Sequence, residues 1–99
     1  AGTVATYWTA IKAALSAAYE QYRTAWEEAG TLVRDVVPAA VTALAKTREG
    51  YQGNKFSYLE VLDAQRTLFE AEEQRIASLA RLHESRAAFD RLRGASRLT

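Results

Sequence analysis

A chain of 99 residues allows one domain, and its 48% hydrophobic and 25% charged residues argue against intrinsic disorder. The absence of cysteine excludes disulfides and thiolate metal sites, while 13 basic and 12 acidic residues leave a net charge of only +1. Five arginines in residues 81–97 give a mild basic bias, which we interpret as a solvated helix face and not as a nucleic-acid site. No apolar run approaches the ~20 residues of a membrane-spanning helix.

The first predicted element is a long helix over residues 4–49. Residues 1–3 fit a remnant of cloning, and no signal-peptide pattern precedes the helix, so we expect any secretion signal to lie outside this sequence. Pro38 removes a backbone donor and crowds the preceding turn, but the apolar stripe keeps its phase across it. We therefore predict one kinked helix; a break at Pro38, with Asp35 capping the restart, is the alternative. The stripe has steps of three and four: Val4, Trp8, Ile11, Leu15, Ala18, Tyr22, Ala25, Ala29, Leu32, Val36, Ala40 and Leu44.

Residues 50–57 predict the tip of an antiparallel helical hairpin. Gly50 and Gly53 are typical helix-ending residues, because glycine takes the left-handed conformation without a steric penalty. Ser57 can cap a second helix, and Glu60 stands three residues later at the spacing of a capping box. Two helix stops followed by a capped restart leave the chain turning back on itself here.

The second predicted helix spans residues 58–93, and Gly94 begins a tail over residues 94–99. It carries two adjacent lines, which suit a helix that packs on two flanks, as in a bundle or a closed ring of helices. The predicted fold is therefore all-α: a long, coiled-coil-like antiparallel helical hairpin that is a piece of something larger. One line runs Val61, Ala64, Leu68, Ala71, Arg75, Ser78, Leu82, Ser85, Phe89 and Leu92; the other runs Leu62, Gln65, Phe69, Glu72, Ile76, Leu79 and His83.

Candidate chemistry is sparse. His83 is the sole histidine, and residue 80 is alanine, so the Glu-x-x-His spacing of helical di-metal sites is missing. Glu60 and Asp63 lie one turn apart. They are either helix-start acids that complement the helix dipole or a paired-carboxylate site that faces a pore or a partner. No nucleophile has a base nearby and no phosphate-binding loop follows a strand. We expect no enzyme, cofactor or metal site.

The tip carries a resemblance to a known family. Residues 53–68 read Gly-Asn-Lys-Phe-Ser-Tyr-Leu-Glu-Val-Leu-Asp-Ala-Gln-Arg-Thr-Leu. This run resembles the hairpin-tip signature of the TolC-like outer-membrane efflux factors, with the CusC/CzcC group of heavy-metal and drug resistance as its nearest branch. The run at residues 37–40 and the run at residues 89–94 also resemble parts of the flanking helices in that family. The similarity covers about residues 15–94.

The resemblance implies a Gram-negative periplasmic location and a role in transport. Such proteins are trimers whose long periplasmic helices form an α-helical barrel, and this chain resembles the tip hairpin of the C-terminal repeat. Membrane contact is implied only through a β-barrel part absent from this sequence. The tip turn would dock a periplasmic adaptor that links the channel to an RND-type pump. By position, Gly53, Asn54, Lys55, Phe56 and Ser57 match the adaptor-contacting turn. Glu60 and Asp63 match acidic residues of the channel entrance.

Two departures from the family pattern affect this assignment. Lys55 stands where many members have arginine, and lysine cannot supply the same bidentate fork to a carboxylate. Glu60 replaces the more usual aspartate.

The alternative function is a free-standing helical hairpin that self-associates into a bundle. An excised hairpin can also form a dimer or other oligomer by covering the face that the barrel would bury.

Overall fold

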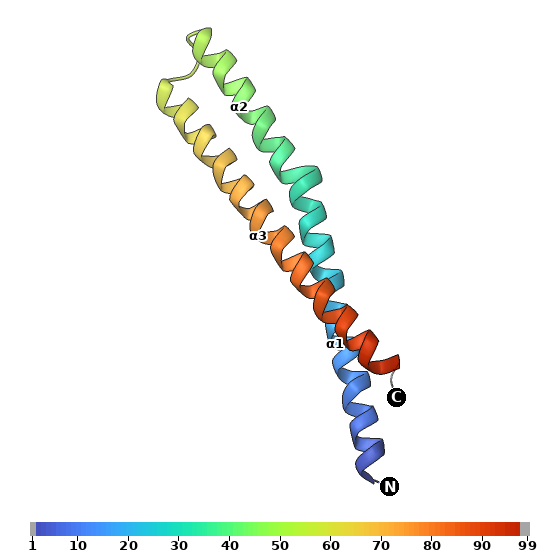
Figure 1. Cartoon of the computed structure of the whole chain (residues 1–99). Coiled ribbons are helices and arrows are strands. Elements are labelled where there is room, and N and C mark those ends of the chain that lie inside the picture. Colours follow the sequence, from blue (N-terminus) through green and yellow to red (C-terminus); the bar gives the residue numbers. More distant parts are fainter. Residues whose placement is uncertain (1, 98–99) are drawn as a thin grey trace. The chain divides into compact units, whose positions relative to one another are not determined.

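The computed structural model describes residues 2–97, which are helical except for residues 53–57 and contain no strand. The predicted all-α class is confirmed (Figure 1). The elements are helix α1 (Gly2–Thr31), the π-helical turn η1 (Leu32–Val36), helix α2 (Val37–Gln52) and helix α3 (Tyr58–Arg97).

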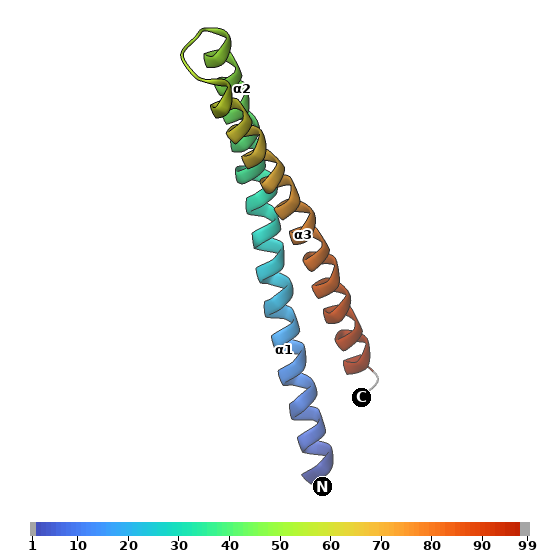
Figure 2. The same ribbon diagram turned by 90° about the vertical axis from the view of Figure 1, so that its left-hand side faces the viewer.

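The described chain forms two compact units. One comprises residues 28–78, and the other joins residues 2–27 to residues 79–97. Within the unit of residues 28–78 the chain reverses at residues 53–57, so that α2 and the first half of α3 run antiparallel, side by side in both views (Figures 1 and 2). This unit is a helical hairpin, as predicted, and it contains every residue of the predicted tip.

Helix α3 turns one of its two predicted lines inward and leaves most of the other exposed. Every member of the line that begins at Val61 is buried or half-buried, in alternating steps of three and four residues. On the neighbouring line Leu62, Phe69 and Ile76 are exposed to 41, 65 and 63%. The alternating steps keep one narrow face of the helix inward. Leu62, Phe69 and Ile76 of the second line therefore form an open apolar stripe on α3.

Ser78 is the most enclosed member of the buried line. Its side chain is fully buried, and its Oγ has no hydrogen-bond partner among the described residues. A buried hydroxyl without a partner lowers stability. The small side chain of Ser78 suits a core that also contains small buried residues of the same unit, such as Ala29 and Ala71.

The first predicted helix is continuous through Pro38 but contains a π turn directly before it. The N–H of Val37 donates to the carbonyl of Leu32, five residues earlier. A π turn is wider than an α turn, and proline ordinarily collides with the carbonyl four residues before it. Val36, which precedes α2, is itself helical, and no side chain caps α2. The alternative of a break capped by Asp35 is therefore wrong.

Around Pro38 the predicted stripe of the first helix is confirmed at Leu32, Ala40 and Leu44 and is wrong at Val36. A step of four residues advances about 40° beyond a full turn, so the predicted steps from Leu32 through Val36 and Ala40 to Leu44 would carry the stripe about 120° around an α-helix. The structure instead takes one step of five through η1: Val37 is half-buried, while Val36 is 37% exposed. The π turn absorbs the extra residue. Between residues 28 and 52, before the tip, the main line of inward residues is Ala29, Leu32, Val37, Ala40, Leu44, Thr47 and Gly50.

Helix boundaries also differ from the prediction. Helix α2 ends at Gln52, past the predicted end at residue 49, and α3 ends at Arg97, past the predicted end at residue 93. Gly94 lies inside α3 and does not have the positive φ that ends many helices, and a glycine in ordinary helical conformation weakens a helix without ending it. Gly2 and Thr3 are helical as well, whereas Ala1 and residues 98–99 lie outside the described residues.

Candidate functional site: the hairpin tip

The end of α2 is closed by two backbone hydrogen bonds. The N–H of Lys55 donates to the carbonyl of Gly50 at 2.7 Å, and the N–H of Asn54 donates to the carbonyl of Tyr51 at 3.1 Å. With Gly53 as the C-cap, these are the six-to-one and five-to-two bonds of a Schellman motif. The motif satisfies carbonyl groups that the last turn of a helix otherwise leaves without partners.

Asn54, and not a glycine, takes the left-handed conformation at the tip. Its φ is 61°, and it is the one non-glycine residue with positive φ in the described chain. Gly53 has φ −88°, which any residue can adopt. The prediction that Gly50 and Gly53 are left-handed is therefore wrong. Asparagine tolerates this region better than other residues with a Cβ atom, which explains how the Schellman motif forms without glycine at that position.

Gly50 is required by close packing and not by its backbone conformation. It lies within α2, is buried, and has the ring of Phe56 against it. A Cβ atom at residue 50 would lie 2.0 Å from Cδ2 of Phe56. The carbonyl of Gly50 also accepts from the N–H of Phe56 at 3.2 Å. Ring packing and backbone bonding thus hold the turn against the end of α2.

The predicted capping box opens α3. The N–H of Ser57 donates to Oε2 of Glu60 at 2.8 Å, and the N–H of Glu60 donates to Oγ of Ser57 at 3.4 Å. Each side chain satisfies a backbone donor at the other residue, so the helix start is defined by its own sequence. The Glu60 carboxylate is consequently engaged within the tip.

The second acidic residue of the predicted site, Asp63, lies one turn further along α3. Its Oδ1 pairs with Nη2 of Arg66 at 3.3 Å, and Nε of the same arginine lies 3.8 Å from Oε1 of Glu70. All three side chains are exposed, and exposed pairs of this kind contribute about 0.2–1 kcal/mol to stability. The structure places Asp63 beside the tip and gives it a cation on its own helix.

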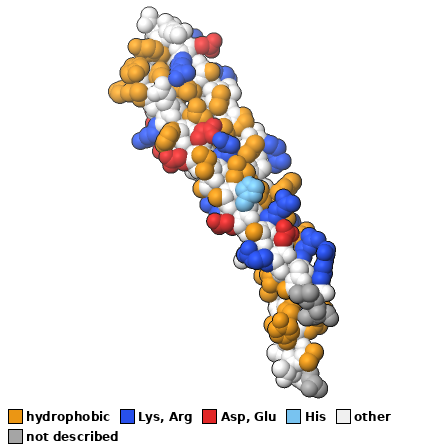
Figure 3. All heavy atoms as spheres, in the orientation of Figure 1, with side chains coloured by type: hydrophobic (Ala, Val, Ile, Leu, Met, Phe, Trp, Pro, Cys, Tyr) orange, Lys and Arg blue, Asp and Glu red, His pale blue; other side chains and the backbone are white. Residues whose placement is uncertain are grey.

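Four large side chains around the turn form an exposed apolar surface, which we call the tip patch: Tyr51, Phe56, Tyr58 and Leu59, exposed to 45, 43, 55 and 75%. The rings of Tyr51 and Tyr58 are tilted toward each other, 5.5 Å apart between centroids. Figure 3 shows hydrophobic side chains gathered at this end of the molecule, over the start of α3. Sequence reasoning missed the patch, although the aromatic residues that interrupt a polar turn were a visible signal.

Lys55 is the one charged residue of the turn at residues 53–57. It is exposed, and within residues 2–97 no carboxylate lies within ion-pair distance of its ammonium group. The tip therefore presents a cation beside an apolar surface, on a backbone fixed by hydrogen bonds on both sides. Exposed apolar side chains beside a cation are a combination that protein–protein interfaces commonly contain.

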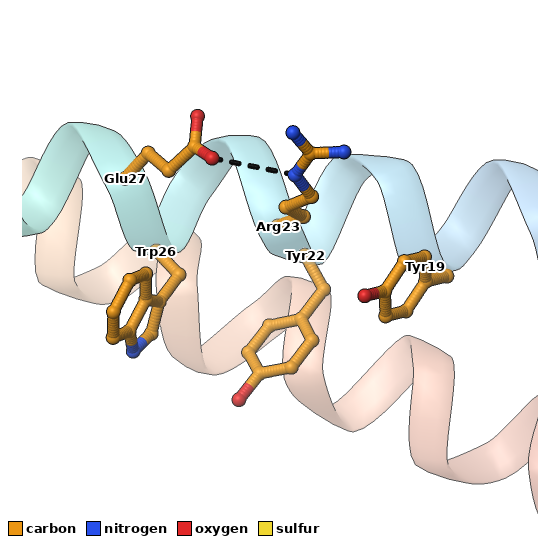
Figure 4. Close-up of a pocket in the computed structure, with 5 residues that line it drawn as sticks. All are labelled: Tyr19, Tyr22, Arg23, Trp26 and Glu27. Carbon is orange, nitrogen blue, oxygen red and sulfur yellow. Dashed lines mark hydrogen bonds and ion pairs between the residues drawn. The ribbon is translucent and has the colours of Figure 1, made fainter.

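A second surface feature lies in the unit of residues 2–27 and 79–97. A shallow hollow of about 350 Å³ runs along α1, where Arg23 pairs with Glu27 at 3.3 Å (Figure 4). Tyr22 stacks on Phe89 of α3 at 6.0 Å between centroids. All lining residues come from one helix and no polar groups converge on a common point, so the hollow defines no chemical site. The hollow is lined by Tyr19, Tyr22, Arg23, Trp26 and Glu27.

Two properties of the described residues concern metals and membranes. Across residues 2–97 no three acidic or histidine side chains cluster in a way that could hold a metal ion. No helix in that range is both long enough and apolar enough to span a bilayer. By its fold and its tip, the described chain is an all-α helical hairpin with an exposed apolar surface at the turn.

Comparison with known proteins adds one informative similarity. The chain is 39% identical over 66 residues to the cobalt-zinc-cadmium resistance protein CzcC of Cupriavidus metallidurans. The match covers 67% of this chain but only 16% of CzcC. No family model matches the chain, and no solved structure does. The chain is thus similar to one segment, about a sixth of the length, of a protein of metal resistance.

Proposed function

We propose that this chain is the periplasmic tip hairpin of an outer-membrane channel component in a tripartite, RND-type efflux system of a Gram-negative bacterium. In this role it docks a periplasmic adaptor and forms part of the channel entrance. The observation that carries the proposal is the 39% identity to CzcC, a cobalt-zinc-cadmium resistance protein, in a chain that folds as a helical hairpin. The resemblance of residues 53–68 to the efflux-factor tip signature supports the same assignment.

Two structural features support docking at the turn. The tip patch exposes aromatic and apolar side chains, which are enriched at the cores of protein interfaces. The Schellman motif and the capping box hold Gly53–Ser57 in one conformation, so a partner meets a turn that needs little ordering. The proposed contact residues are Gly53, Asn54, Lys55, Phe56 and Ser57, and Glu60 and Asp63 are proposed to face the channel entrance.

The open stripe on α3 supports a place within a larger helical assembly. Phe69 and Ile76 are more than 60% exposed, and a neighbouring helix would remove their apolar surface from water. In the proposed trimer this stripe packs against an adjacent hairpin of the α-helical barrel. The buried line and the open stripe then give α3 a neighbour on each of two flanks.

The test is site-specific cross-linking in the intact parent protein, in cells. The natural segment has no cysteine, so Gln52→Cys at the tip and Arg81→Cys in the middle of α3 give two defined positions. With a short bifunctional reagent and mass spectrometry, we expect Gln52→Cys to capture a periplasmic adaptor and Arg81→Cys not to. Capture of the same neighbours from both positions, or capture of no adaptor from Gln52→Cys, would overturn the docking role.

The same open stripe favours a second candidate, a free-standing hairpin that self-associates. Leu62, Phe69 and Ile76 repeat every seven residues, a spacing typical of helix–helix contact. This candidate predicts a stable oligomer of the isolated chain in analytical ultracentrifugation and loss of that oligomer in a Phe69→Glu variant. A monomer over the whole concentration range would exclude it.

A further inference from the structure

We propose that the tip recognises a carboxylate of its partner through Lys55, and that apolar partner side chains beside this carboxylate cover the tip patch. The inference rests on the proposed docking function and adds the chemistry of the partner surface: a protein segment with an aspartate or glutamate flanked by apolar residues. The lysine, and not the two acids that open α3, is the charge through which the turn selects its partner.

The charges around the turn favour this assignment. Glu60 is held by the backbone N–H of Ser57 at 2.8 Å, and Asp63 is paired with Arg66 at 3.3 Å. Glu49, at the end of α2, makes no ion pair with Lys55. Both acids that open α3 therefore have partners within the hairpin, whereas the Lys55 ammonium has none among the described residues. An incoming carboxylate would meet an available cation.

The backbone position of Lys55 is fixed before any partner arrives. Its N–H donates to the carbonyl of Gly50 at 2.7 Å, and the next N–H, of Phe56, donates to the same oxygen at 3.2 Å. The Phe56 ring packs on Gly50 and anchors the residue that follows Lys55. Only the lysine side chain remains to be ordered on binding, which limits the entropic cost of forming the pair.

The tip patch determines how strong the pair becomes. An exposed Lys–carboxylate pair contributes little because water and salt screen it. When apolar partner groups cover Tyr51, Phe56, Tyr58 and Leu59, water leaves the surroundings of Lys55 and the attraction strengthens. A free anion such as phosphate would neutralise the lysine but leave the four apolar side chains exposed. The patch therefore favours a protein segment over a small anion.

The experiment uses a carbodiimide, which couples an amine to a carboxylate only where the two touch. Membranes that hold the parent protein and its partner are treated, and the amide-linked peptides are identified by mass spectrometry. The lysines of the chain are Lys12, Lys46 and Lys55, so the first two serve as internal controls. We expect a product that joins Lys55 to an aspartate or glutamate of the partner, and no such product at the two controls.

Variants of Lys55 separate charge recognition from docking, with Gln52→Cys capture as the measure of docking. Lys55→Arg keeps the charge but cannot be coupled, so the carbodiimide product should vanish while capture stays within about twofold. Lys55→Glu should lower capture by about tenfold or more, which corresponds to 1.4 kcal/mol, because it places the new glutamate carboxylate opposite the carboxylate of the partner.

Each remaining outcome counts against a defined statement. Unchanged capture in Lys55→Glu, or a partner peptide joined equally to Lys46, would overturn carboxylate recognition and leave adaptor docking intact. Absence of capture from Gln52→Cys with Lys55 unaltered would overturn docking itself and the carboxylate contact with it. Capture lost equally in Lys55→Arg and Lys55→Glu would show that the lysine acts through its shape and not its charge, which also rejects the proposal.

Discussion

The tip and the π turn both interrupt the regular helical hydrogen-bond pattern of this chain, but for different reasons. At the tip the causes lie within residues 50–60, where each residue acts on a near neighbour through a cap, a ring contact or a backbone bond. At the π turn the cause extends over residues 29–50, because the inward residues before and after it differ in phase by one residue. Local chemistry sets the first interruption, and the count of residues between core positions sets the second.

Obstructing the close packing of Phe56 on Gly50 gives the largest expected effect. In Gly50→Ala the added Cβ would lie 2.0 Å from a ring atom of Phe56, so the ring must leave its place on α2. We expect a loss of about 1–2 kcal/mol in the free energy of unfolding, as in other overpacked sites. Urea unfolding followed by far-UV circular dichroism measures it. An increase in stability would mean that Phe56 does not pack there.

A matched glycine provides the control. Gly94 also lies within a helix, and a Cβ atom added to it would meet nothing within 4 Å. Gly94→Ala should therefore stabilise the chain by about 0.5–1 kcal/mol, the usual helical preference for alanine. In a Phe56→Ala background Gly50→Ala should change sign and stabilise as well, since the obstructing ring is gone. The same substitution then separates the packing effect from backbone preference.

Deleting one residue from the π turn tests whether phase is its cause. Without Val33, which is 45% exposed, the step from Leu32 to the next inward valine becomes four residues, and α-helical bonds can run through. We expect amide hydrogen exchange over residues 34–37 to slow by about tenfold, which is 1.4 kcal/mol of added protection. Exchange at the tip should not change. If exchange over the turn stayed fast, the phase difference would not be what maintains it.

The left-handed residue at the tip gives a smaller effect. Asn54→Ala should cost about 1 kcal/mol, since the left-handed region is unfavourable for a residue with a Cβ atom and asparagine bears it better. Asn54→Gly should be neutral or slightly stabilising. Thermal unfolding of the two variants side by side measures the difference. Equal stability of the alanine and glycine variants would show that the turn does not require positive φ at residue 54.

These differences explain which parts of the molecule the sequence could predict. The hairpin, the capping box of Ser57 and Glu60 and the buried line of α3 follow from short spacings, and the structure confirms them. Both Gly53 and Asn54 can take the left-handed conformation at the end of a helix, and glycine is the commoner choice. Only the exact helix end, which the sequence does not define, decides between them. The one sequence signal for the π turn is the three successive four-residue steps of the apolar stripe from Leu32 to Leu44. The tip patch required knowledge of which side chains remain uncovered.

The smallest effect should come from Pro38→Ala. This variant distinguishes whether the π turn arises from the proline itself or from the spacing of the inward residues. Proline in a helix interior costs about 3 kcal/mol, so its removal would be expected to stabilise strongly. Here Pro38 stands at the start of α2, directly after a π turn that widens the backbone around it. We therefore expect a gain below about 1 kcal/mol in urea unfolding and unchanged amide exchange over residues 32–36, because the extra residue is still present. A gain near 3 kcal/mol, with slowed exchange, would show that the proline alone imposes the turn; the two interruptions would then both be local.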